Sequence, residues 1–242
     1  MTQHTSSEKH FVWRGRDVTR VENFSDIVFA LSLTLIVASS VPTTFDNLVS
    51  LWREAIAVAM CFALVLLIWS KHHAFHRRYG LDDGPTVLLN AVVLFLIMIF
   101  AYPLKFLALF LVNFFTGFYS SAPEIAAVLS LDQVQWFIVI YAMGYAAVFG
   151  VFALLYAHAL KRADDLELSP AERIMTRLEV DQGLAAMAIS GLAAMTALLL
   201  PDRFSPMGGS VYFLIGPVVA ILTQRARKRA DTAQAEAGGS VD

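Results

Sequence analysis

The chain has 242 residues, of which 57% are hydrophobic and only 16% are charged, and its formal net charge is -2. Soluble domains carry about a quarter charged residues, so this composition excludes an ordinary soluble domain, and the net charge gives no indication of nucleic-acid binding. The single cysteine, Cys61, excludes a disulfide framework or a cysteine-based metal site.

Apolar residues gather in blocks of about 20, the length that a helix needs to cross the hydrocarbon core of a bilayer. Six such spans are predicted, at residues 27–41, 51–69, 87–112, 134–160, 184–200 and 211–222. We therefore predict an all-α, multi-pass integral membrane protein. We expect the first helix to begin near Val21, and the Gly216-Pro217 pair to kink the sixth.

Lysine and arginine orient the chain because they gather in alternate connections between the spans. They occur in both tails and in the second-to-third and fourth-to-fifth connections, whereas residues 42–50 and 113–133 contain none. The positive-inside rule then predicts that both termini are cytoplasmic. We divide the chain into an N-terminal tail (1–20), a six-helix membrane domain (21–225) and a C-terminal tail (226–242) that is basic and then disordered.

The first span is more polar than the other five, and its polar groups begin at its N-terminal end. Asp26 lies there, and ionisable groups inside a membrane are costly and usually mark a pathway. An ion pair between Asp26 and Arg20 at the interface is an equally good interpretation of this residue.

Helical spacing sorts the deeper residues of this span into two faces. One face holds Leu31, Thr34, Leu35 and Ala38, at positions i, i+3, i+4 and i+7. A second stripe holds Ser25, Ser32 and Ser39, at intervals of seven residues. Small residues let helices approach closely, and spacing alone favours packing as the role of both faces.

The start of the first span also carries a motif, Arg20-x3-Phe24-Ser25-Asp26, followed by an Ala–Leu–Thr–Leu run. Further polar and aromatic residues mark the next two spans: Trp69, His72, His73 and Asn90. Together these features resemble the transmembrane protein 175 family of potassium channels, and in particular its bacterial members with one six-helix unit per chain. The resemblance covers about the first hundred residues.

The resemblance implies a potassium-selective, leak-like channel of the cell inner membrane. In it the first helices of four copies surround a central pore, so this chain would be a homotetramer in the bilayer. The implied constriction consists of Leu31, Thr34, Leu35 and Ala38, with Leu31 innermost and Ala38 smaller than the residue in relatives. The implied polar network around the first helix consists of Arg20, Phe24, Ser25, Asp26, Asn90 and one of two adjacent histidines, for which we favour His72 over His73. Potassium would be the transported ion, with no resident cofactor or metal.

Two other functions stay open on the residues themselves. A proton-coupled secondary transporter would use Asp26 and a histidine as a relay, and a non-conducting membrane scaffold would need neither. The absence of a detectable inverted repeat argues mildly against the transporter. An enzyme would need a convergent polar constellation, which the sequence does not contain, so we expect no enzymatic activity.

Two further features have a structural interpretation. The histidines of the His72-His73-x-x-His76 cluster suit the C-terminal end of the second helix, where positive charge stabilises the helix dipole, better than a metal site. Lys105 lies in the outer part of the third span. We expect its side chain to snorkel to the interface rather than to place a charge in an outer vestibule.

Overall fold

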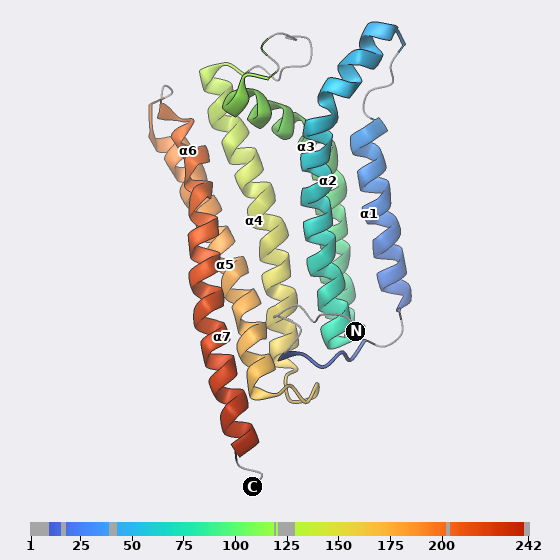
Figure 1. The fold of residues 1–242 in the computed structure, drawn as a ribbon, viewed down its shortest axis with the longest axis vertical. Coiled ribbons are helices and arrows are strands. Elements are labelled where there is room, and N and C mark those ends of the chain that lie inside the picture. The colour runs from blue at the N-terminus through green and yellow to red at the C-terminus, as the bar shows by residue number, and fades with distance from the viewer. Residues whose placement is uncertain are drawn as a thin grey trace. The chain divides into compact units, whose positions relative to one another are not determined.

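The computed structural model describes residues 10–15, 18–38, 43–118, 120, 129–201 and 204–239, apart from the side chains of residues 102, 131, 132 and 236–239. The helices are α1 (Arg20–Ala38), α2 (Phe45–Tyr79), α3 (Gly84–Thr116), α4 (Leu131–Lys161), α5 (Pro170–Leu199), α6 (Met207–Ser210), the 3-10 helix η3 (Val211–Leu214) and α7 (Ile215–Gly239) (Figure 1). No strand occurs among these residues. Six helical stretches are long and apolar enough to cross a membrane, which confirms the predicted all-α membrane architecture.

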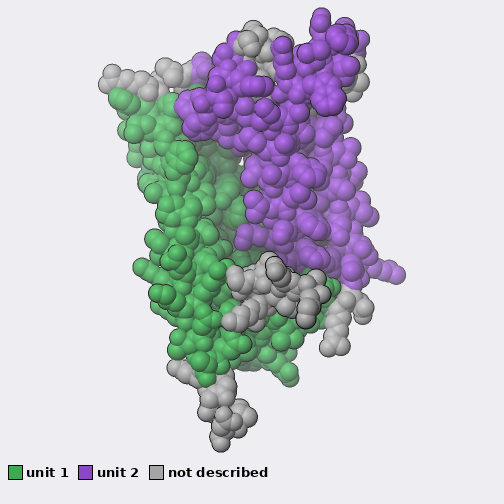
Figure 2. All heavy atoms as spheres, viewed as in Figure 1, with its two compact units in different colours: residues 1–17, 75–90, 131–242 green, residues 18–74, 91–130 purple. Residues whose placement is uncertain are grey.

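The chain forms two compact units, coloured separately in Figure 2. Unit 1 comprises residues 1–17, 75–90 and 131–242, and unit 2 comprises residues 18–74 and 91–130. The long helices α2 and α3 therefore contribute to both units.

Unit 1 is built on the packing of α4 against α5. The two helices lie close together at Gly183, where an added Cβ would lie 2.7 Å from the Cβ of Ala153. The α5 helix begins with a capping box: Ser169 accepts a hydrogen bond from the backbone of Glu172, whose side chain accepts one from the backbone N–H of Ser169. Reciprocal capping of this kind satisfies two backbone donors that a helix start leaves open.

Residues 10–15 attach to this capped end of α5. Arg14 donates from its two terminal nitrogens to the two carboxylate oxygens of Glu172, at 2.8 and 3.0 Å, and the backbone N–H of Val12 donates to the same carboxylate at 3.0 Å. Glu172 is only 2% exposed. A buried carboxylate is tolerated because charged and backbone donors surround it.

The sixth predicted span changes helix type just before the Gly216-Pro217 pair, which itself lies within the first turn of α7. The backbone tightens to the 3-10 helix η3 immediately before α7 begins at Ile215. The α7 helix then continues to Gly239, so residues 230–239 are helical where the composition led us to expect disorder. The reason is the alanine content of this stretch, since alanine has the highest helix propensity of all residues.

Unit 2 contains α1, most of α2 and residues 91–116 of α3, with Pro103 inside α3. Lys105 lies two residues beyond this proline, and its Nζ is 2.5 Å from Oε2 of Glu54 on α2. The Lys105 and Glu54 residues are 7% and 8% exposed. The expectation that Lys105 snorkels to the interface is therefore wrong, because a carboxylate on the neighbouring helix pairs with the ammonium group.

Candidate functional site

The α1 helix begins at the residues that carry the sequence motif. The hydroxyl of Thr19 accepts a hydrogen bond of 3.1 Å from the backbone N–H of Glu22, and the Thr19 carbonyl accepts one of 3.0 Å from Asn23. A threonine in this position caps a helix start. The start of α1 is thereby set one turn before Phe24-Ser25-Asp26.

The two faces of α1 differ sharply in burial. Ser25 and Ser32 are fully buried and Ile36 is 1% exposed, whereas Leu31 is 52% and Leu35 is 43% exposed. Thr34 and Ala38, the other members of the proposed constriction, are exposed as well. Ser39 lies outside the described residues. The single chain thus covers the serine stripe of α1 and leaves the Leu31/Leu35 face uncovered.

The hydroxyl groups of α1 donate to its own backbone. Ser32 donates to the carbonyl of Val28 at 2.9 Å, and Thr34 donates to the carbonyl of Ala30 at 3.0 Å. Because each hydroxyl hydrogen is donated to a backbone carbonyl of the same helix, the lone pairs of the hydroxyl oxygen remain available to a cation. For Thr34 these lone pairs lie on the uncovered face of α1.

Two rungs of polar contact join α1 to α2 within unit 2. In the first, Nε1 of Trp69 donates to Oδ1 of Asp26 at 2.7 Å. In the second, Nδ1 of His73 lies 3.4 Å from Oε1 of Glu22. The rings of Trp69 and His73 stack with centroids 5.4 Å apart at an interplanar angle of 19°. Glu22 and Asp26 are one turn apart on α1, as Trp69 and His73 are on α2, so these four residues form one cluster, the α1–α2 ladder.

The sequence analysis did not predict Glu22 as a member of this ladder, nor Trp69 as the partner of Asp26, and of the two adjacent histidines it favoured His72, whereas the ladder contains His73. The signal that was present is the i, i+4 spacing of the two pairs, which places each pair on one helix face. Among the described residues, Asp26 contacts the Trp69 indole and forms no ion pair with Arg20.

The other predicted network residues differ in burial and in the partners that they contact. Arg20 and Phe24 are exposed, and the Ser25 hydroxyl donates to the carbonyl of Val21 at 2.7 Å. His72 is 1% exposed and its ring packs on Phe29, with centroids 5.5 Å apart. Asn90 is 3% exposed and belongs to unit 1. Within unit 2, Asp26 thus contacts Trp69 and Ser25 contacts the backbone of its own helix, rather than the other predicted network residues.

A separate polar cluster lies in unit 1, at the turn between α2 and α3. One oxygen of Asp83 lies 2.7 Å from both Nε2 of His158 and a terminal nitrogen of Arg162, while the other accepts hydrogen bonds from Thr86. Partial burial pushes the pKa of Asp83 up, but the hydrogen bonds from Thr86 and His158 outweigh it and lower the pKa to about 2. Among the described residues, no three His, Cys, Asp or Glu side chains group so as to hold a metal ion.

Comparison with known proteins places this architecture in a family. A sequence model described as the endosomal/lysosomal potassium channel TMEM175 matches residues 20–103, which include all four members of the α1–α2 ladder. A potassium channel of Marivirga tractuosa is 35% identical over 227 residues, covering 91% of this chain and 92% of the relative. The chain belongs to the TMEM175 family.

Other TMEM175 relatives agree in fold and in name. A potassium channel of Chamaesiphon minutus is 29% identical over 163 residues, which cover 64% of this chain and 71% of the relative. The crystal structure of a variant of the potassium channel MtTMEM175, in complex with a nanobody–MBP fusion protein, superposes with a TM-score of 0.79 at 34% identity, covering 90% of this chain and 97% of that chain. These TMEM175 relatives are potassium channels and not enzymes.

Proposed function

We propose that this chain is a potassium-selective, leak-like channel of the cell inner membrane, assembled as a homotetramer with α1 lining a central pore. The observation that carries the proposal is the uncovered face of α1, where Leu31 and Leu35 are 52% and 43% exposed beside Thr34. The names of the relatives supply the ion, and the resemblance to the family supplies the number of copies.

The uncovered face suits a constriction because its side chains repeat along one line of the helix. In a closed ring of identical copies, each residue of this face appears once per copy around the axis. A ring of leucine side chains offers no ligands to an ion, so a cation that passes it must give up part of its water. Potassium loses water more readily than sodium, and such apolar necks also gate by dewetting.

The Thr34 hydroxyl supplies an oxygen ligand, which leucine side chains lack. Its hydrogen is used by the Ala30 carbonyl, so its oxygen can face a cation that has lost water at the Leu31 and Leu35 rings. We propose Leu31, Thr34, Leu35 and Ala38 as the constriction, with Ala38 leaving the outer end wider.

The α1–α2 ladder supports the channel over the proton-coupled transporter. A relay needs Asp26 to exchange protons with a histidine, whereas the group that donates to Asp26 is an indole, which is a hydrogen-bond donor only. We propose that the ladder, with Arg20, Phe24, Ser25, His72 and Asn90, holds α1 in place around the pore.

Flux measurements in liposomes test the proposal. The purified protein should pass potassium in preference to sodium down a gradient, and Leu31→Ala or Leu35→Ala should raise total flux and reduce that preference. Leu67→Ala is the matched control, because Leu67 is 60% exposed on α2; its flux should equal that of the wild type. Absence of flux, or flux that stays coupled to a proton gradient, would refute the channel. Cross-linking in detergent checks the tetramer.

A further inference from the structure

The far end of α7 carries a dense group of basic residues that the proposed function does not use. Arg225, Arg227, Lys228 and Arg229 fall within five positions, and all four are exposed. Ala226 and Ala230, on the remaining face of the same turns, are 9% and 0% exposed. The helix is therefore seated on its alanine face, and the bases project from the rest of its circumference.

These four bases differ from five other arginines of unit 1, each of which is paired with an acid. The paired arginines are Arg14, Arg78, Arg162, Arg173 and Arg177, and their partners are Glu172, Glu179, Asp83, Asp164 and Asp181. No acidic side chain among the described residues pairs with any of the four bases of α7. A dense group of positive charge without acidic partners in the described part of the chain is thus concentrated on this part of α7.

Asp231, the acidic residue that follows the four bases, contacts His10. Oδ1 of Asp231 lies 3.4 Å from Nε2 of His10, whose Nδ1 lies 3.0 Å from the side-chain oxygen of Gln234. The N-terminal segment therefore binds the last turns of α7 and engages its carboxylate. The acid nearest to the four bases in the sequence thus has its contact with His10.

The residues before the bases identify the kind of partner. Phe213, Leu214 and Ile221 are 71%, 47% and 48% exposed, and only 6% of the apolar window of this span is buried inside the protein. A helix this apolar and this uncovered faces acyl chains in a bilayer. Since the bases follow directly after Gln224, they lie where the headgroups of the same lipids lie.

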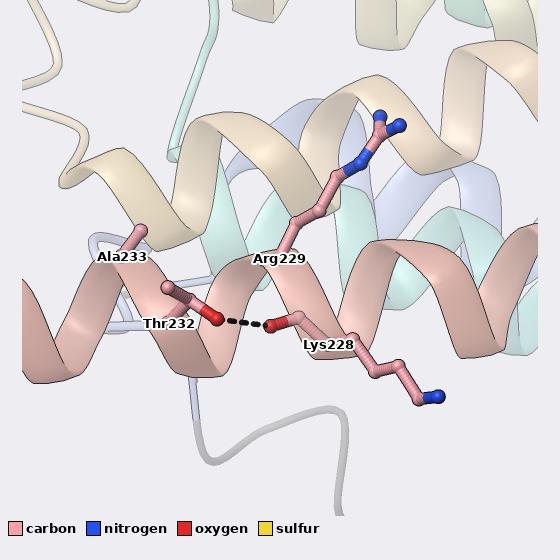
Figure 3. A pocket seen from close by; sticks show the side chains of 4 residues that line it. All are labelled: Lys228, Arg229, Thr232 and Ala233. Atoms are coloured by element: carbon pink, nitrogen blue, oxygen red, sulfur yellow. Dashed lines mark hydrogen bonds between the residues drawn. The ribbon is translucent and has the colours of Figure 1, made fainter.

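The surface also has a hollow at this level. Lys228, Arg229, Thr232 and Ala233 line a space of about 300 Å³, and the Thr232 hydroxyl donates to the Lys228 carbonyl at 3.0 Å. Figure 3 shows that the Lys228 and Arg229 side chains leave the helix in different directions. Two cationic groups at the edges of an open hollow suit a phosphate with a small headgroup better than a deeply enclosed ligand.

We propose that Arg225, Arg227, Lys228 and Arg229 form a binding surface for the phosphate-bearing headgroups of anionic phospholipids, with the lipid tails against the apolar part of α7. Basic residues beside a membrane contribute about fivefold each to the binding of anionic lipid. Removing two of them should therefore raise the dissociation constant for anionic lipid by about 30-fold.

Native mass spectrometry of the full-length protein in neutral detergent tests this surface. Short-chain phosphatidylglycerol should bind the wild type more tightly than short-chain phosphatidylcholine, and glycerol phosphate, which lacks tails, should compete only weakly. The double variant Arg227→Gln/Lys228→Gln should bind phosphatidylglycerol about 30-fold more weakly, while Arg227→Lys should bind it as the wild type does.

The double variant Lys161→Gln/Arg177→Gln is the matched control, since it removes the same charge from the exposed ends of α4 and α5. It should leave lipid binding unchanged. Equal binding of the two lipids, glycerol phosphate competing as well as phosphatidylglycerol, or equal losses in the two double variants would each overturn the proposal. The experiment measures lipid binding rather than ion flux, so a negative result for the lipid surface is distinct from a failure of the proposed channel function.

Discussion

Nε1 of Trp69 donates a 2.7 Å hydrogen bond to Oδ1 of Asp26, and this contact joins α2 to the start of α1. A hydrogen bond to a carboxylate is among the stronger polar contacts in proteins. Because His73 stacks on the same indole and also reaches Glu22, one aromatic side chain supports both rungs of the α1–α2 ladder. The placement of the proposed pore helix within unit 2 therefore depends on Trp69.

Trp69→Phe should destabilise the protein, because it keeps an aromatic ring but removes the donor to Asp26. We expect a loss of about 1–2 kcal/mol, seen as a fall in Tm of about 2 to 8 °C for a chain of this size. Differential scanning fluorimetry in detergent measures it. Trp52→Phe is the control, since Trp52 is 75% exposed on the same helix and its loss should leave Tm unchanged.

Asp26→Ala should give the same fall in Tm as Trp69→Phe, and the double variant should lose little more, because both changes remove one hydrogen bond. It should also reduce recovery of the assembled oligomer while any remaining flux keeps its preference for potassium. Additive losses, or normal assembly of Asp26→Ala with unchanged flux, would contradict the supporting role of the ladder.

Sequence reasoning predicted the spans and the faces of α1 because both are properties of one helix at a time. Span length follows from bilayer thickness, and a 3.6-residue period separates the buried Ser25 and Ser32 from the exposed Leu31 and Leu35. Contacts between helices were not predictable in this way. Spacing shows which residues share a face, but the partner of Asp26 is decided by how α1 packs on α2.

Lys105 shows the same limit for an isolated charge. A lysine near the end of a span has one locally visible option, which is to extend along the helix to the interface. The carboxylate that pairs with it lies on another helix, at Glu54, and no local pattern links the two positions. The histidine pair is similar, since adjacent residues meet different partners: His72 packs on Phe29 and His73 reaches Glu22.

The Glu54–Lys105 pair should behave as a buried unit in a double-mutant cycle. Lys105→Met alone leaves a buried carboxylate without its ammonium partner, which costs about 3–5 kcal/mol in comparable buried pairs. Changing both residues, as in Glu54→Leu/Lys105→Met, removes the uncompensated charge and should recover most of the lost stability. Thermal unfolding of the three variants in detergent gives the coupling energy.

Arg53→Gln provides the control for this cycle, because Arg53 neighbours Glu54 but is exposed. Its effect on Tm should be small, as for most surface substitutions. Equal Tm values for the single and double variants would show that the pair contributes nothing as a unit.

Asp83 should make the stability of the protein sensitive to acid. Its pKa is lowered from the ordinary 3.8 of an aspartate to about 2 in the folded protein, so the folded state binds the proton less readily than the unfolded state. The stabilisation is therefore complete above about pH 4 and is lost as pH falls towards 2. The difference in Tm between wild type and Asp83→Asn should be largest at pH 5 and above, and should shrink as pH is lowered to 3. The exposed neighbour Asp82 gives the control, and a difference for Asp82→Asn of equal size and pH dependence would contradict this role of Asp83.

Gly183 should tolerate no side chain, because α4 leaves no room for one there. A methyl group at this position would lie 2.7 Å from the Cβ of Ala153 and 2.9 Å from the carbonyl oxygen of Phe149, both too short for a real contact. Gly183→Ala should therefore separate the two helices and cost about 1–3 kcal/mol, measured as a lower Tm in detergent. Gly191→Ala lies on the same helix with nothing within 4 Å of the added methyl group. It should leave Tm unchanged or raise it, because alanine favours a helix over glycine by about 1 kcal/mol.

The close approach at Gly183 also predicts a rescue. One of its two obstacles is a side chain, so Ala153→Gly combined with Gly183→Ala should restore part of the lost Tm. The other obstacle is the Phe149 carbonyl, which no substitution removes, so the rescue should stay incomplete. If Gly183→Ala were as stable as Gly191→Ala, the two helices would have to sit further apart than the structure places them.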